Sequence, residues 1–287
     1  IWGFKSQRIN IMIKDMAIIN AYKMDGLGND FLIIDRRTKA VNLNKNKIIE
    51  LSKQNNVKFD QLIFIDQEIK NTIPIVIFNS DGEEISACGN GSRCVAYLIG
   101  KEKMISNISL QTNERILTTE IVGDLTVKIN MGKPIFFWDK IPLSKNIDCR
   151  EINIDIEGNK FRKGFALNIG NPHIIFFVKD CLKIKIEQLG PKIENHTLFP
   201  KKCNVTFAQV NNKNNISVNV WERGAGLTKA CGTAACATAV ASHLKGFTEK
   251  KVNIIFKEGV LNLELDKNQN VFMTGPVSEI KKIKIKI

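Results

Sequence analysis

The sequence predicts an α/β (α+β) fold made of two pseudo-symmetric, duplicated lobes, each a mixed β-sheet or barrel wrapped around a central apolar helix. The tripeptide Ala-Cys-Gly occurs at Cys88 and again at Cys231, which is an interval of 143 residues (231 − 88). An apolar segment follows each cysteine and ends at Gly100 or Gly246. Short β-branched runs, which are typical of strands, lie between these motifs. A repeated motif in repeated surroundings indicates a duplicated lobe.

Further pairs of positions on the N-terminal side of each cysteine follow nearly the same interval. These pairs are Asn79 and Glu222, Gln61 and Asn204, and the dipeptides Gly28-Asn29 and Gly170-Asn171. Because several positions share one register, chance explains them poorly, and a lobe of about 140 residues that occurs twice explains them well.

The strands and the central helices are predicted from local patterns. The β-branched runs expected to be strands are 60–66, 73–79, 116–121, 125–131, 174–178 and 216–221. The segments after Cys88 and Cys231 are apolar on nearly every side, and a helix of that kind is normally buried. We therefore expect a buried helix in each lobe with a cysteine at its entrance.

Composition and length are those of an ordinary soluble protein. The chain has 287 residues, of which 44% are hydrophobic and 25% charged, and this length favours two lobes over one core. No apolar run approaches the roughly 18 residues of a transmembrane helix, and no export signal is visible, so we expect a cytoplasmic protein. Residues 1–15 are interpreted as a non-native or disordered extension, with Met16 as the natural start.

The formal net charge of +13 raises the possibility of a nucleic-acid-binding protein. The lysines are scattered singly except near the C-terminus, and no nucleic-acid motif occurs. The charge is therefore interpreted as surface composition, and we expect no nucleic-acid or membrane partner. A steep salt dependence of DNA or RNA binding would favour the alternative.

The seven cysteines favour neither a disulfide scaffold nor a metal site. Their number is odd, the chain is large, and the spacings lack a second cysteine pair or a histidine pair. We expect no metal and no cofactor. Most of the cysteines are interpreted as small buried apolar residues.

Cys88 and Cys231 are interpreted differently because of what surrounds them. Free N–H groups and the dipole at a helix N-terminus lower the pKa of a thiol, and the glycines that follow both cysteines let a ligand approach the backbone. Two opposed helix ends could hold a carboxylate with its α-carbon between the two sulfurs. One thiolate would then remove the α-proton, and the other thiol would protonate the opposite face.

The two cysteines have two other interpretations. Both could be buried structural residues, but the symmetric pair and its flanking glycines argue against that. One could be a nucleophile with a histidine base such as His173, but the duplicate cysteine would then lack a purpose.

The sequence resembles the diaminopimelate epimerase family over nearly its whole length, from about residue 17 to the end. The matching segments are KMDGLGNDF (23–31), FDQ (59–61), FNSDG (78–82), ACGNGSRC (87–94), GNPH (170–173), NVTF (204–207) and ERGAGLTKACGTAAC (222–236). The resemblance implies interconversion of LL- and meso-2,6-diaminopimelate in lysine biosynthesis, without pyridoxal phosphate or metal.

The resemblance also implies roles for individual residues. Cys88 and Cys231 would be the acid/base pair, and His173 and Glu222 would modulate the thiol pKa values. The implied substrate contacts are Asn29, Gln61, Asn79, Gly89, Asn90, Asn171, Asn204, Glu222, Arg223, Gly232 and Thr233. Arg223 suits a carboxylate, and Glu222 with amide oxygens suits an ammonium group.

The family's last strand returns to the first lobe. The resemblance therefore implies an N-terminal lobe of residues 17–132 plus 277–287 and a C-terminal lobe of 133–276. A homodimer is the assembly we consider.

Several positions depart from the family's usual residues. They are Asp25, Ser92, Leu227, Lys229 and Ala234. Ala234 should be tolerated if its φ is negative, and Lys229 is interpreted as an exposed lysine. These departures affect fine tuning and leave the expected reaction class unchanged.

Enzymes of related architecture are the closest rivals, namely proline racemase-like and phenazine-biosynthesis-like isomerases. Proline has no distal ammonium or carboxylate, so Glu222, Arg223 and the paired amides would have no purpose with it. A pyridoxal-phosphate enzyme would need a Schiff-base lysine and a phosphate site.

Overall fold

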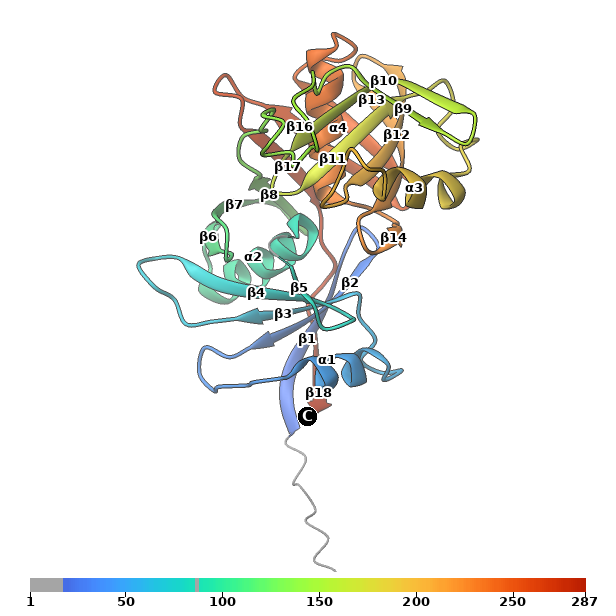
Figure 1. The fold of residues 1–287 in the computed structure, drawn as a ribbon. Helices are drawn as coiled ribbons and strands as arrows, with labels where there is room; N and C mark the ends of the chain where they lie inside the picture. Colours follow the sequence, from blue (N-terminus) through green and yellow to red (C-terminus); the bar gives the residue numbers. More distant parts are fainter. Residues whose placement is uncertain (1–17, 86–87) are drawn as a thin grey trace, which may run out of the picture.

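A computed structural model describes residues 18–85 and 88–287, which form two lobes stacked one above the other (Figure 1). The predicted extension at residues 1–15 lies outside these residues. The first half contains β1 (Ile18–Gly26), β2 (Asn29–Asp35), α1 (Lys45–Ser52), β3 (Gln61–Ile65), β4 (Ile73–Asn79), β5 (Glu84–Ile85), α2 (Gly89–Lys103), β6 (Asn107–Gln111), β7 (Ile116–Gly123) and β8 (Thr126–Asn130).

The second half repeats this order and adds strands at both ends. It contains β9 (Ile152–Ile156), β10 (Asn159–Asn168), β11 (Pro172–Phe177), α3 (Ile186–Glu194), β12 (Asn204–Asn212), β13 (Asn215–Glu222), β14 (Gly226–Leu227), α4 (Gly232–Leu244), β15 (Lys251–Phe256), β16 (Gly259–Leu265), β17 (Val271–Pro276) and β18 (Lys281–Lys286). Every strand expected from a β-branched run is present, with bounds that differ by a few residues.

Strand pairing confirms the predicted duplication. In the first half β2 and β3 are parallel, β3 and β4 are antiparallel, and β4 then pairs in parallel with β6. The second half repeats this pattern with β11, β12, β13 and β15. The meander β6-β7-β8 corresponds to β15-β16-β17. The mixed α/β fold with two duplicated lobes is therefore as predicted.

Two pairings connect distant parts of the chain. The corresponding strands β8 and β17 pair with each other in antiparallel orientation and so join the two halves. The last strand, β18, pairs with β1 at the start of the described chain, and Figure 1 shows the C-terminus beside the lower lobe. The lobe boundaries at 132/133 and 276/277 stay a prediction.

The helices α2 and α4 lie inside the two lobes. Residues 89–100 of α2 and 232–242 of α4 are all buried. A helix that is surrounded by sheet on every side needs apolar or small side chains on every face, which the two segments supply. The two central helices are thus where the sequence predicts them. None of the helices in the described parts of the chain is long and apolar enough to span a membrane.

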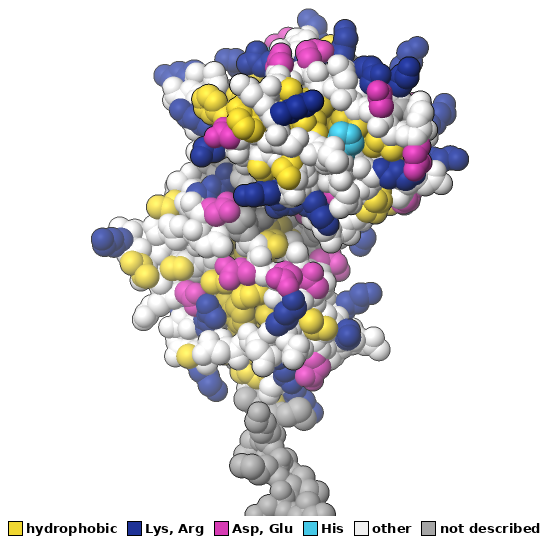
Figure 2. All heavy atoms as spheres, viewed as in Figure 1, with side chains coloured by type: hydrophobic (Ala, Val, Ile, Leu, Met, Phe, Trp, Pro, Cys, Tyr) yellow, Lys and Arg dark blue, Asp and Glu magenta, His cyan; other side chains and the backbone are white. Residues whose placement is uncertain are grey.

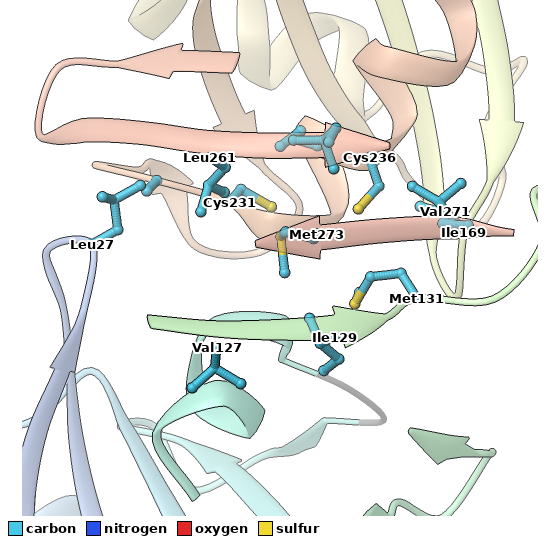
Figure 3. Packing of buried hydrophobic residues seen from close by; sticks show 14 of the residues in the cluster. Leu27, Val127, Ile129, Met131, Ile169, Cys231, Cys236, Leu261, Val271 and Met273 are labelled. Carbon is cyan, nitrogen blue, oxygen red and sulfur yellow. The ribbon is translucent and has the colours of Figure 1, made fainter. Parts of the chain in front are cut away.

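Methionine side chains support the two helix entrances from below. Figure 3 shows Met273 and Met131 between the paired strands β17 and β8. A Cβ atom added to Gly89 would lie 2.6 Å from Cε of Met273, and one added to Gly232 would lie 3.0 Å from the same atom. The first turns of both helices therefore approach one shared methionine closely.

Candidate active site

A cavity of about 460 Å³ lies between the lobes and is lined by residues of both halves. The first half contributes Asp60 and Asp81 among other residues, and the second half contributes Arg223 and Lys229. Along the boundary of the lobes in Figure 2, acidic side chains gather on the lower lobe and basic side chains on the upper one. The cavity is therefore suited to a small molecule that carries both charges.

A smaller chamber of about 30 Å³ adjoins this cavity and contains both repeated cysteines in its wall. Five residues line the cavity and the chamber alike. They are Asn29, Gln61, Asn171, Glu222 and Thr233. A space of this size holds one small group, so a ligand in the cavity can place one carbon between Cys88 and Cys231.

The two cysteines have nearly the same backbone geometry. Cys88 is the N-cap of α2, with φ −139° and ψ 108°, and Cys231 is the N-cap of α4, with φ −130° and ψ 114°. The Cys88 sulfur accepts a hydrogen bond from the Gly91 N–H at 3.4 Å. The Cys231 sulfur lies 3.4 Å from the Thr233 hydroxyl. Each sulfur thus lies at the N-terminus of a buried helix.

Burial outweighs the helix N-terminus in setting the thiol pKa values. Loss of water raises the pKa of Cys88 to about 11, although the N–H groups of Gly91 and Asn90 oppose the rise. Burial also raises the pKa of Cys231 well above its usual value. The helix end acts in the expected direction, but the expected net lowering is wrong, and both groups are thiols at neutral pH.

Glu222 lies where the cavity meets the chamber. Burial raises its pKa, and hydrogen bonds with Cys231 and Thr228 partly offset that rise. Its negative charge in turn contributes to the raised pKa of both Cys88 and Cys231. Glu222 is therefore electrostatically coupled to both sulfurs.

His173 is fully buried and lines neither the cavity nor the chamber. Its Nε2 atom lies 2.7 Å from Oδ1 of Asn171, and Nδ1 has no hydrogen-bond partner in the described residues. Burial and the positive charge of Arg223 lower the pKa of His173 to about 3, so the imidazole is neutral at neutral pH. It orients Asn171 directly, and its influence on the thiol pKa values stays a prediction.

Paired amides line the cavity on the first lobe. Nε2 of Gln61 donates to Oδ1 of Asn79 at 3.1 Å, and Nδ2 of Asn90 donates to Oδ1 of Asn29 at 3.2 Å. The remaining oxygens, Oε1 of Gln61 and Oδ1 of Asn90, are buried and have no partner in the described part of the chain. Two residues that line the chamber thus each have a buried acceptor whose hydrogen-bonding capacity is unused.

Asn204 connects two segments of the second lobe. Its Oδ1 accepts the Arg223 N–H at 2.9 Å, and its Nδ2 donates to the carbonyl of Pro172 at 2.9 Å. Because its side chain is nearly fully buried, it fixes the backbone on either side of the cavity as well as lining it.

The two Gly-Asn loops that carry Asn29 and Asn171 each touch the opposite half. The β1–β2 turn at Gly28 meets Glu258, and Figure 3 shows the neighbouring Leu27 reaching the upper lobe. Gly170 meets the guanidinium group of Arg115, which donates to the carbonyl oxygens of Met131 and Ile169. Both glycines have positive φ, at +84° and +102°, which favours glycine.

The diaminopimelate epimerase family model matches residues 21–137 and 165–280. The chain belongs to the diaminopimelate epimerase family. It is 49% identical to the diaminopimelate epimerase of Pelagibacter ubique, an alignment that covers 94% of this chain and 99% of the relative. It is 44% identical to the diaminopimelate epimerase of the Wolbachia of Brugia malayi, over 89% and 96% of the two chains.

Solved structures outside the diaminopimelate epimerase family share the fold. A phenazine biosynthesis protein of the PhzF family from Enterococcus faecalis matches with a TM-score of 0.68 and 12% identity, covering 94% of this chain and 100% of that chain. A hydroxyproline epimerase from Agrobacterium vitis matches with a TM-score of 0.66 and 11% identity, covering 94% and 93%. The fold therefore does not separate the rivals, whereas the sequence match does.

Every residue predicted from the family to be catalytic or to bind substrate lines the cavity or the chamber. His173, predicted to modulate pKa values, is the exception. Asp60 and Asp81 also line the cavity next to the amides, and no role was predicted for them from the sequence. Both belong to motifs of the diaminopimelate epimerase family, FDQ and FNSDG, so their place beside Gln61 and Asn79 is the signal that could have found them.

Two departures from the usual residues of diaminopimelate epimerases have the expected consequences. Lys229 is exposed at the edge of the cavity, as interpreted. Ala234 lies in the first turn of α4, where its φ is not positive and its methyl group is accommodated.

Proposed function

We propose that this chain interconverts LL- and meso-2,6-diaminopimelate by passing the α-proton between Cys88 and Cys231, as a step of lysine biosynthesis. The observation that carries the proposal is that both sulfurs line one small chamber, each at the N-terminus of a corresponding helix. The membership in the diaminopimelate epimerase family supports the choice of substrate.

The proton balance of the reaction needs only the two thiols. One sulfur, as thiolate, removes the α-proton, and the electron pair is delocalised into the substrate carboxylate. The other thiol then delivers its proton to the opposite face of the same carbon, which inverts the configuration. The two sulfurs end with their protonation states exchanged, so the next substrate of opposite configuration restores them.

The two helix entrances would hold the carboxylate of the reacting end. The backbone N–H groups after Gly89 and Gly232 are at the positive ends of α2 and α4, where anions bind favourably. The negative charge that develops on this carboxylate during proton removal is stabilised by the same groups.

The remaining charged groups of the substrate suit the polar cavity. The free oxygens of Gln61 and Asn90, together with Glu222, can accept hydrogen bonds from the ammonium group beside the reacting carbon. Arg223 can hold the distal carboxylate with two hydrogen bonds. A substrate without a distal amino acid group would leave these residues unused.

Substrate binding would also activate the thiols. Burial holds the pKa of both groups above their ordinary value, which favours the uncharged form. An ammonium group brought within a few ångströms favours the thiolate, because opposite charges in a site of low dielectric attract strongly. The substrate itself therefore supplies the charge that makes one sulfur a base.

A cytoplasmic location is part of the proposal. All seven cysteines are free, and the two-thiol mechanism requires Cys88 and Cys231 to remain reduced. A reducing compartment maintains that state.

A homodimer also stays a proposal. Within the described residues β18 pairs only with β1, which leaves the other edge of β18 available to a second copy of the chain. Sedimentation of the purified protein measures the assembly.

Deuterium incorporation tests the proposed reaction. The purified protein is incubated in deuterated water with LL-diaminopimelate and, separately, with L-proline, and α-deuterium is measured by mass spectrometry. We expect exchange and epimerisation of diaminopimelate alone. Exchange of proline alone would reject the proposal.

Serine substitutions test the roles of the two sulfurs. Cys88→Ser and Cys231→Ser each remove one proton carrier, so each should reduce epimerisation by at least about 100-fold. Full turnover by either single variant would exclude the two-thiol mechanism. Cys181→Ser, at a buried cysteine outside the chamber, is the control and should retain activity.

A further inference from the structure

A buried carboxyl group lies behind the Glu222–Arg223 segment and lines neither the cavity nor the chamber. It belongs to Glu194, the last residue of α3, which is 5% exposed. No lysine, arginine or histidine of the described residues pairs with it. A buried carboxyl group without a cation needs hydrogen-bond donors and a reason for its position.

The donors come from both sides of the segment that faces the substrate. Oε2 of Glu194 accepts the indole N–H of Trp221 at 2.7 Å, and Oε1 accepts the backbone N–H of Gly224 at 3.0 Å. These two residues directly flank Glu222 and Arg223. Glu194 therefore fixes both ends of the turn that carries Glu222 and Arg223.

The helix α3 determines where the indole lies. A Cβ atom added to Gly190 would lie 2.5 Å from Cγ of Trp221, so the ring packs directly on the helix one turn before Glu194. On the other side of the turn, a Cβ added to Gly226 would lie 3.4 Å from the same ring. The ring thus has little freedom, and the hydrogen bond to Glu194 fixes its orientation.

We propose that Glu194 is a positioning residue that keeps Glu222 and Arg223 in the geometry required to bind the substrate. The inference rests on the proposed function, and Glu194 acts through the backbone of this turn without touching the substrate. Asn204, which accepts the Arg223 N–H, provides a third fixed point between the two made by Glu194. Loss of the Glu194 contacts releases both ends of the turn. It should therefore weaken substrate binding more than it slows the chemical step.

Glu194→Gln tests the inference because it keeps the size of the side chain. The amide has only one oxygen, so its NH₂ group faces one of the two N–H donors. We expect the KM for diaminopimelate to rise about tenfold or more, the size of effect expected for loss of a hydrogen bond to a charged group, while kcat changes less than about threefold. Trp221→Phe removes only the indole donor and should raise KM by a smaller factor.

A matched control separates positioning from stability. Ser242→Ala in α4 removes another buried side-chain hydrogen bond of the same lobe, between Ser242 and Thr248 at 2.8 Å. We expect its Tm to fall while its KM stays at the wild-type value. An unchanged KM in both Glu194→Gln and Trp221→Phe would overturn the inference, even if their Tm values fall.

A double-mutant cycle identifies the route of the effect. In the background of Arg223→Ala, one of the two substrate contacts that Glu194 is proposed to position is already lost, and only that of Glu222 remains. Glu194→Gln should then raise KM by a smaller factor than it does in the wild-type background, and a full additive increase would overturn the inference. If the wild-type protein fails to epimerise diaminopimelate, the proposed function fails; a wild-type enzyme with an insensitive Glu194 overturns the inference alone.

Discussion

Cys88 and Cys231 show how one position can carry two opposing physical effects. The helix N-terminus favours a thiolate, and burial in a chamber of about 30 Å³ favours a thiol. Burial is the larger effect, so it keeps both sulfurs protonated at neutral pH. This balance could not be predicted from the sequence, because it depends on how completely the two lobes exclude water.

The raised thiol pKa values predict a rise of activity with pH. Deprotonation of Cys88 is governed by a pKa of about 11, so the reactive thiolate fraction increases throughout the neutral range. Between pH 6.5 and about 8.5, kcat/KM should rise close to tenfold per pH unit, measured in overlapping buffers at constant ionic strength. A plateau that begins near pH 7 would contradict the assigned burial effect.

The lowered pKa of His173 predicts that the free energy of unfolding falls in acid. Its folded-state pKa of about 3 lies below the value near 6.5 of an unfolded chain, so the unfolded protein binds the extra proton as the pH falls below 6.5. At pH 5 this costs about 2 kcal/mol of unfolding free energy relative to pH 7. Urea denaturation at both pH values measures the loss.

His173→Gln is the control for that measurement. Glutamine does not titrate, so the difference in unfolding free energy between pH 7 and pH 5 should shrink by the same amount. An unchanged difference would mean that other groups cause the acid sensitivity.

At the level of secondary-structure elements, the central helices were predictable and their close contacts were not. The sequences after Cys88 and Cys231 are apolar all round, and this property alone indicates burial. Gly89 and Gly232, in contrast, share a close contact with Met273. A tertiary contact of this kind joins residues that are far apart in sequence and carry no common pattern.

Gly100 of α2 is also closely surrounded by residues from other segments of the chain. A Cβ atom there would lie 2.3 Å from Cδ1 of Ile121 and 2.7 Å from the carbonyl oxygen of Ile105. Gly100→Ala should therefore destabilise the protein by about 1–3 kcal/mol through overpacking, although alanine favours a helix. Chemical denaturation measures the change.

Gly123→Ala serves as the matched control. Its added Cβ atom would meet nothing closer than 3.8 Å, so its unfolding free energy should change by less than about 0.5 kcal/mol. Equal effects of the two substitutions would show that backbone entropy and not crowding determines the cost.

At the scale of the whole molecule, the repeat register of the sequence alone locates most of the site. Pairs such as Gln61 with Asn204 and Asn79 with Glu222 stand at corresponding ends of corresponding strands, so a duplicated sequence pattern becomes a shared cavity. The return of β18 to β1 was predictable only from the resemblance to a family. Nothing local in an alternating strand indicates which distant partner it will have.

Removal of β18 tests how much this return stabilises the protein. Deletion of residues 281–287 exposes the edge of β1 and removes Ile285, which is 1% exposed. We expect a loss of at least about 2–5 kcal/mol, the range for removing one large buried side chain, because strand pairing is lost as well, together with a greater tendency to aggregate. Calorimetry and light scattering measure the two effects.

Lys284→Gln and Lys286→Gln together keep the strand and remove only charge. This variant should retain the wild-type Tm, because the cost of the deletion comes from pairing and burial. A comparable loss in the charge variant would assign the effect to electrostatics instead.

The antiparallel contact between β8 and β17 has a consequence for stereochemistry. Equivalent strands that pair in antiparallel orientation are related by a local twofold axis (a dyad), so the polypeptide resembles an isologous dimer fused into one chain. A dyad through a planar carbanion exchanges its two faces. In the proposed two-thiol reaction, such a dyad would present the corresponding residues Cys88 and Cys231 to opposite faces of one carbon.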